Sequence, residues 1–203
     1  QISGLATSQI AALSNLQVRV LSANQAAGFS STQMGSLTTA ALSNLTTTAF
    51  AAVGPASVQG LTSQQVGALT TDQVVALTTD QVSTLTTAQL SSMTTAQIAV
   101  IETDDLQALT TAQLVTATTA QIASLTTDQV VALTTAQVSK MSNTQVASLT
   151  SKQVSVMETS DLNALSGAQI ASMKTVQIAA LTTDQFSNLK TAQIKSLTSA
   201  QMA

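Results

Sequence analysis

Residues 69–76 read LTTDQVVA, and the same eight letters return at residues 125–132. Stepping by eight from Leu5 to Leu197 gives an apolar residue at every start except the small Ala117, with no insertion or deletion in the frame. We number the positions of this octad one to eight, so that the common pattern is apolar, Thr, Thr, any residue, Gln, apolar, any residue and a small residue. A repeat of this kind predicts an architecture of stacked, similar units.

The period of eight restricts the local structure. Eight residues at about 100° each overshoot two helical turns by about 80°, so the apolar positions would spiral off the face of one continuous helix. A heptad coiled coil fails for the same reason, and in a strand positions one and six would point to opposite faces. A short helix that restarts in every octad fits the pattern. The sequence therefore predicts an all-α solenoid of short capped helices, with a β-solenoid as the alternative.

Local signals support this frame. A Thr at position two and a Gln at position five have the spacing of a capping box, and the apolar residues at positions one and six have that of a hydrophobic staple. Pro55 falls at position three, the first helical residue, where proline is favoured. Gly4, Gly28 and Gly60 fall at position eight, where glycine commonly terminates a helix. The acidic residues all lie at positions two, four or five, in the first turn, where the helix dipole favours negative charge: Asp72, Asp80, Glu102, Asp104, Asp105, Asp128, Glu158, Asp161 and Asp184.

Residues 1–203 are predicted to form a single continuous array, in which residues 1–60 are more degenerate because Ala and Ser replace several position-five glutamines. A longer period lies above the octad, since IETDDL at 101–106 returns as METSDL at 157–162. Segmental duplication is the simpler explanation, and a superhelix whose turn divides seven octads is the other. The sequence begins and ends within an octad, without an initiating Met or a signal peptide, and we expect it to be a piece of a longer array.

Composition argues against several function classes. Charged residues are 7% of the chain, against about 25% in typical globular proteins, and aromatic residues are 1%. The chain has no Cys and no His, so disulfides, thiolate or imidazole metal sites and Cys or His nucleophile–base pairs are excluded. Its six Lys and Arg residues are scattered, which disfavours nucleic acid as a partner. No run of about 18 apolar residues predicts a transmembrane segment. We expect no enzyme activity, no catalytic residue and no cofactor.

One acidic cluster, Glu102, Asp104 and Asp105, is the best candidate for a binding site, and Glu158 and Asp161 echo it. Calcium takes several oxygen ligands, and two carboxylates can serve as an acid–base pair. No calcium-binding loop motif accompanies the cluster, so we interpret these residues as charges at helix starts and predict no metal site. The repeated Thr pairs could present an ice-binding surface, but we interpret them as capping and solvated residues.

Two resemblances follow from these units. The octad at residues 69–76 resembles the opening helix of the repeats in transcription-activator-like effectors. Those repeats are much longer, carry a second helix and read DNA through a loop that this chain lacks, so the likeness implies nothing about DNA binding. More of the chain resembles the Thr/Gln octad arrays of very large secreted or surface proteins of bacteria, described as adhesin- or hemagglutinin-like. The LTTAQ and LTTDQ units and the variant at residues 102–105 carry this likeness, which implies an exported, extended surface protein.

We therefore expect a structural repeat protein that forms an extracellular filament or a surface stalk. The two aliphatic side chains of an octad bury too little area to offset the entropy of ordering eight residues, so the units must stack on one another. Low charge also removes much of the repulsion between copies, which makes the protein itself the expected partner. The alternative is an adhesin or ice-binding module that uses the Thr-rich surface.

Overall fold

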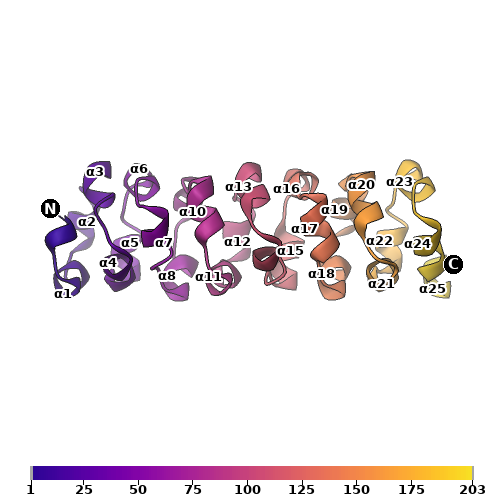
Figure 1. Cartoon of the computed structure of the whole chain (residues 1–203), viewed down its shortest axis with the longest axis horizontal. Helices are drawn as coiled ribbons and strands as arrows, with labels where there is room; N and C mark the ends of the chain where they lie inside the picture. The colour runs from indigo at the N-terminus through magenta and orange to yellow at the C-terminus, as the bar shows by residue number, and fades with distance from the viewer. Residues whose placement is uncertain (1, 203) are drawn as a thin grey trace. The chain divides into compact units, whose positions relative to one another are not determined.

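The structure is a computed structural model that describes residues 2–202, and in this range every regular element is a helix (Figure 1). The prediction of an all-α solenoid is confirmed, and the β-solenoid alternative is wrong for the described residues. The chain divides into two compact units, Gln1–Leu109 (unit 1) and Thr110–Ala203 (unit 2), and we describe each by itself. Within residues 2–202 no helix combines the length and the apolar character needed to cross a membrane.

Helices start at position three of each octad and span four to six residues, after one 3-10 turn near the start of the chain. The elements of unit 1 are η1 (Ile2–Gly4), α1 (Thr7–Ala11), α2 (Asn15–Arg19), α3 (Ala23–Ala26), α4 (Ser31–Ser36), α5 (Thr39–Leu42), α6 (Thr47–Ala51), α7 (Pro55–Val58), α8 (Ser63–Gly67), α9 (Thr71–Val75), α10 (Thr79–Thr84), α11 (Thr87–Ser92), α12 (Thr95–Ile98) and α13 (Thr103–Ala108). The elements of unit 2 are α14 (Thr111–Leu114), α15 (Thr119–Ser124), α16 (Thr127–Ala132), α17 (Thr135–Lys140), α18 (Asn143–Ser148), α19 (Ser151–Val156), α20 (Thr159–Ala164), α21 (Gly167–Ser172), α22 (Thr175–Ile178), α23 (Thr183–Ser187), α24 (Thr191–Ser196) and α25 (Ser199–Met202).

The predicted capping box starts these helices. In α9 the Thr70 side chain accepts a hydrogen bond from the Gln73 backbone N–H, and Gln73 Oε1 accepts one from the Thr70 backbone N–H, both at 3.1 Å. The pair satisfies two backbone donors that a helix start leaves without partners. Pro55 is the first residue of α7, with Gly54 as its N-cap, as the frame predicts.

Two successive extended residues turn the chain between helices. Leu133, which follows α16, has φ −58° and ψ 136°, and Thr134, the N-cap of α17, has φ −75° and ψ 150°. No described residue, glycine included, has a positive φ. The position-eight glycines therefore do not end their helices in the left-handed conformation, because ordinary extended residues at positions one and two make the corner.

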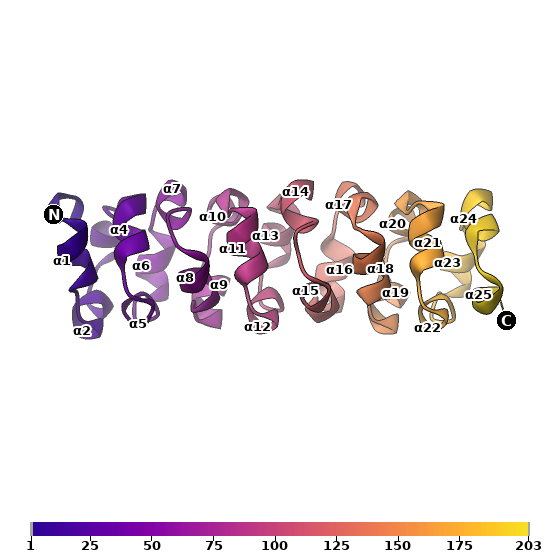
Figure 2. The same ribbon diagram turned by 90° about the horizontal axis from the view of Figure 1, so that it is seen from below.

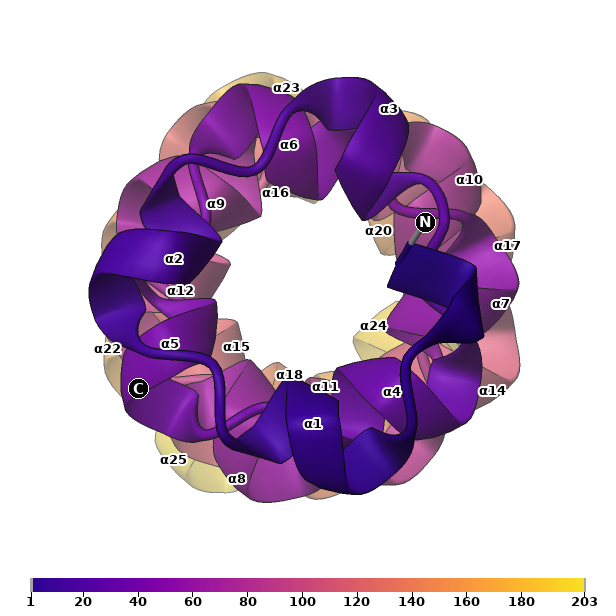
Figure 3. The same ribbon diagram turned by 90° about the vertical axis from the view of Figure 1, so that its left-hand side faces the viewer.

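The helices of each unit wind into a superhelix. In unit 1, followed from its N-terminus away from the viewer, α1, α2 and α3 succeed one another clockwise, which makes this superhelix right-handed (Figure 3). In both units a helix packs against the helix three further along, as α8 does on α11 and α21 on α24 (Figure 2).

Positions one and six form the apolar core of both units. In unit 1, Val74 at position six is 1% exposed and Leu77 at position one is 5% exposed. Phenylalanine fills the same places at Phe29 and Phe50, which are also buried. The burial follows the pattern read from the sequence, and its energy depends on stacking, since these side chains are covered by other octads.

Position five adds a polar interaction between turns. Gln73 is 1% exposed, and its Nε2 donates to the main-chain carbonyls of Leu42 and Leu45, each at 2.8 Å. Those carbonyls belong to octads one superhelical turn earlier, 31 and 28 residues back along the chain. We call this pair of bonds the glutamine clamp. In unit 2, Gln153 makes it to Ile122 and Leu125.

Hydrogen bonds between turns indicate how many octads one turn of the superhelix contains. Hydrogen bonds between neighbouring turns join residues 25 to 31 positions apart, so one turn holds between three and four octads. Two such turns hold between about six and eight octads, so the 56-residue period is compatible both with segmental duplication and with a superhelix whose turn divides seven octads.

Replacing Gln73 by Met should lower the free energy of unfolding by about 2–4 kcal/mol, because it removes the clamp and one capping bond from a buried site. Gln17→Met is the matched control, since Gln17 makes only the capping bonds. We expect it to cost less than about 1 kcal/mol. Urea unfolding followed by circular dichroism measures both, and equal losses in the two variants would contradict the clamp.

Gly60 lies at a close approach between turns. A Cβ built on Gly60 would lie 2.2 Å from the Ser31 carbonyl oxygen, whereas one on Gly4 would meet nothing within 4 Å. Gly60→Ala should therefore destabilise the chain by about 2–3 kcal/mol through steric overlap. Gly4→Ala, also at position eight, should change the stability by less than about 0.5 kcal/mol. Thermal unfolding compares the two, and a harmless Gly60→Ala would show that the turns are not packed this closely.

Candidate functional surfaces

The outer surface consists mainly of positions two, three, four and seven. In the octad that begins at Leu69, Thr70, Thr71 and Asp72 are exposed, while Gln73 and Val74 are buried. The Thr70 hydroxyl oxygen is engaged in the capping box, so the position-three hydroxyl is the one turned outward. The surface is therefore dominated by small side chains, methyl groups and threonine hydroxyls.

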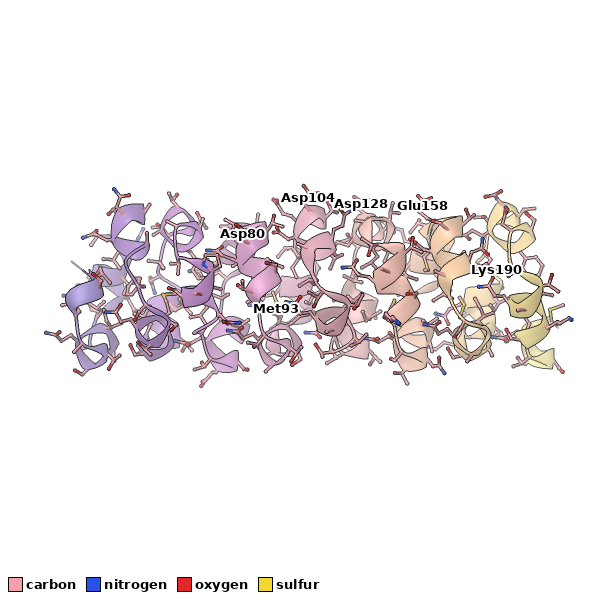
Figure 4. The ribbon with its side chains drawn as sticks, viewed as in Figure 1. Asp80, Met93, Asp104, Asp128, Glu158 and Lys190 are labelled. Atoms are coloured by element: carbon pink, nitrogen blue, oxygen red, sulfur yellow. The ribbon has the colours of Figure 1, made fainter. Side chains whose placement is uncertain are left out.

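Several carboxylates of each unit lie on neighbouring turns of the superhelix. In unit 2, Asp128 on α16, Glu158 at the start of α20 and Asp184 on α23 lie on successive turns, since they are 30 and 26 residues apart and hydrogen bonds between neighbouring turns span 25 to 31 residues. Figure 4 shows Asp128 and Glu158 pointing to the same side. In unit 1, Asp80 lies on α10, which packs against the acidic helix α13.

The predicted cluster Glu102, Asp104 and Asp105 surrounds the start of α13 but does not converge. Glu102 is the N-cap and is exposed, Asp104 is exposed, and Asp105 is 4% exposed and faces the preceding turn. Residues 2–202 contain no group of three acidic side chains placed to hold one metal ion. The geometry agrees with the interpretation of Glu102 and Asp104 as charges at a helix start.

Asp105 and Asp161 have a different position from the other acids, because they occupy the place of the clamping glutamine. Each carboxylate accepts a hydrogen bond from a threonine of the preceding turn, from Thr79 at 2.8 Å and from Thr135 at 2.6 Å. A carboxylate has no hydrogen with which to bond the carbonyls of that turn. Each unit thus contains one octad in which a buried carboxylate replaces the clamp.

The N-caps of these octads differ as well. Glu102 and Glu158 replace the usual Thr or Ser, and neither makes a side-chain capping bond. Sequence reasoning assigned Asp105 and Asp161 to the helix start and missed their burial. Burial could have been inferred from the acidic residue at position five, where most octads have Gln. That inference requires knowing that position five faces the previous turn, which the sequence alone does not show.

Burial raises the pKa of both aspartates above the usual range. The Thr79 and Thr135 hydroxyls partly oppose this, while Glu102 and Asp104 raise the pKa of Asp105 further and Glu158 that of Asp161. On the packed helices, Asp80 lies on α10, Lys140 on α17 and Asp184 on α23. A protonated carboxyl group gains a donor that can reach a main-chain carbonyl, as the glutamine does.

Exposed apolar side chains accompany some of the acids. Val75 on α9 and Val131 on α16 are 43% and 42% exposed, three residues after Asp72 and Asp128. Residues three apart share a helix face. Each unit therefore carries a carboxylate and an exposed valine side by side.

Comparison with known proteins identifies the family. The ALTTAQ repeat family model matches residues 2–39, 42–79, 98–135 and 154–191. These segments cover most of the chain, which belongs to the ALTTAQ repeat family. No curated protein matches the sequence.

The two buried aspartates should make stability depend on pH. Because their pKa values are raised in the folded chain, they favour folding most when protonated, and this contribution is lost as the pH rises through the raised pKa. Acidification from pH 7 to about pH 4 should therefore stabilise the wild-type chain more than Asp105→Asn/Asp161→Asn, whose side chains do not titrate. Thermal unfolding at both pH values measures the difference.

Asp72→Asn/Asp128→Asn is the matched control, because it removes two exposed carboxylates from the same two units. If this control changes the pH dependence of stability as much as Asp105→Asn/Asp161→Asn does, the pH dependence arises from surface charge and not from the buried aspartates.

Proposed function

We propose that this member of the ALTTAQ repeat family is a structural protein, a filament or a stalk at the cell surface or outside the cell. The observation that carries the proposal is the glutamine clamp, which recurs turn after turn in both units. Because each added octad makes the same contacts with its neighbours, the free energy of unfolding increases with the number of octads. The array can therefore be long without needing a separate hydrophobic core.

The surface supports the same role. Thr70, Thr71 and their counterparts present small hydroxylated side chains, and charged residues are 7% of the chain. Such a surface is hydrated and repels neighbouring copies weakly. The extracellular location is supported by the likeness of the LTTAQ and LTTDQ units to bacterial surface arrays.

A second candidate is an adhesin, and the paired carboxylates and valines favour it. Asp72 with Val75, and Asp128 with Val131, combine a charge with exposed apolar area on one helix face. A partner with basic and apolar side chains would complement them. An ice-binding surface has less support, because the position-two hydroxyls are occupied in the helix caps.

A structural role predicts that length follows the number of octads. A tandem fusion of two copies joined in the octad frame should give a particle of about twice the contour length and the same width as the single chain. Negative-stain electron microscopy measures both lengths. A compact particle that thickens with added repeats would contradict a filament or stalk, and immunolabelling of intact producing cells tests the location.

A further inference from the structure

The charges of the chain are segregated by sign along the sequence. Between Arg19 and Lys140 there is no Lys or Arg, and this segment holds six of the nine acidic residues. All five lysines lie in unit 2, at Lys140, Lys152, Lys174, Lys190 and Lys195. The carboxylates of unit 1 therefore have no lysine of their own unit with which to pair.

One carboxylate of unit 1 lies next to an exposed valine. Asp72 is exposed and Val75 is 43% exposed, and they share a face of α9 because they are three residues apart. This helix is packed between α6 and α12, so Val75 lies in the interior of the array and not at an end. We call Asp72 and Val75 the acid–valine surface.

Unit 2 carries a basic counterpart on α19 and α22. Val176 on α22 is 60% exposed, and Lys174, the exposed N-cap of α22, stands two residues before it. The Ser151 hydroxyl of α19 donates to the Val176 carbonyl at 3.1 Å, which brings Lys152, the exposed residue after Ser151, to the same place. Two lysines therefore lie beside an exposed apolar side chain, and we call Lys152, Lys174 and Val176 the lysine–valine surface.

The exposure of this surface comes from its place in the octad. Lys152 and Val176 occupy position four, which is exposed in every octad between residues 69 and 188. The helix α22 is itself packed between α19 and α25. No other octad in this range has an aliphatic residue larger than Ala at position four. Val176 is therefore an apolar side chain at a place where the array otherwise has small or polar ones.

We propose that the lysine–valine surface of one copy docks on the acid–valine surface of a second copy. Lys152 and Lys174 bring positive charge to Asp72, and Val176 covers Val75 in the same contact. Opposite charges favour the encounter of the two surfaces, while the covered apolar area stabilises the contact. This inference rests on the proposed structural function and specifies a partner and an interface for it.

The equivalent acidic pair in unit 2 is a poorer partner. Asp128 and Val131 lie on α16, which packs against α19, the helix that carries Lys152. Asp128 therefore has a lysine on the neighbouring turn of its own chain, whereas Asp72 has none in its unit.

The contact determines how copies associate. The two surfaces differ, so the contact is heterologous, and a copy bound through its lysine–valine surface keeps its acid–valine surface free for a third copy. An exposed ion pair contributes about 0.2–1 kcal/mol and is screened by salt. Association through this contact is therefore weak for any two copies, strongest at low ionic strength, and open-ended.

Reversing the charges of one surface should weaken the association. Lys152→Glu/Lys174→Glu places carboxylates opposite Asp72. Lys190→Glu/Lys195→Glu is the matched control, because it makes the same change in net charge at exposed positions of the same unit. Circular dichroism establishes that the variants are folded, and sedimentation velocity over a concentration series measures association at about 0.01 M and about 1 M ionic strength.

Asp72→Lys reverses the charge of the other surface, with Asp80→Lys as its control. Asp80 is also an exposed position-four aspartate of unit 1, but its octad has no valine at position seven. An equimolar mixture of Asp72→Lys and Lys152→Glu/Lys174→Glu again pairs surfaces of opposite charge, so the mixture should associate more strongly than either variant alone.

We expect the wild-type chain and both controls to associate at low ionic strength and to separate at high ionic strength. The association constant should fall by roughly tenfold or more in each of the two surface variants and should recover in their mixture. A wild-type chain that stays monomeric at low ionic strength and high concentration would overturn the inference. Controls that weaken association as much as the surface variants, or a mixture that does not recover, would overturn it as well. A monomeric chain whose tandem fusion still doubles in length would leave the filament or stalk function standing, which separates the two proposals.

Discussion

A primary amide buried between two turns is the interaction on which this superhelix depends. The interior glutamine side chain uses its oxygen to cap its own helix and both amide hydrogens to bond the turn before, as Gln73 does with Leu42 and Leu45. A buried amide without partners costs about 1–3 kcal/mol, so this residue is tolerated only where all three bonds form together. Local capping and long-range packing are thereby fixed by one side chain.

This constraint explains the rigid octad frame. The Gln73 amide donates to two carbonyls 28 and 31 residues earlier in the chain. A single residue inserted between Leu45 and Gln73 would move both carbonyls out of its reach. The frame from Leu5 to Leu197 contains no such insertion. Where the glutamine is absent, other groups act in its place: the Ser57 hydroxyl donates to the Phe29 carbonyl, and Asp105 accepts from Thr79. The array thus varies in side chains while it keeps its spacing.

The sequence was sufficient to predict the short helices, their starts and the buried positions, because capping and burial are encoded within eight residues. It was not sufficient to predict the second function of Gln73, since its partners Leu42 and Leu45 lie a full turn away. The same limit applies to Gly60, which looked like a helix terminator and instead makes room for the Ser31 carbonyl. Asp105 looked like one more helix-start charge for the same reason. Contacts between turns depend on the curvature of the superhelix, and the octad pattern does not encode that curvature.

Hydrogen exchange of the glutamine side-chain amides tests the central claim most directly. Nuclear magnetic resonance resolves the side-chain NH2 signals, and assignment separates interior glutamines such as Gln73 and Gln153 from Gln9 and Gln17 of the first turn. Because the interior amides donate both hydrogens to buried carbonyls, their exchange with deuterium should be slow, while the first-turn amides exchange rapidly in the monomer. Rapid exchange at all of these positions would contradict the account, since it would mean that the turns are not held together by their glutamines.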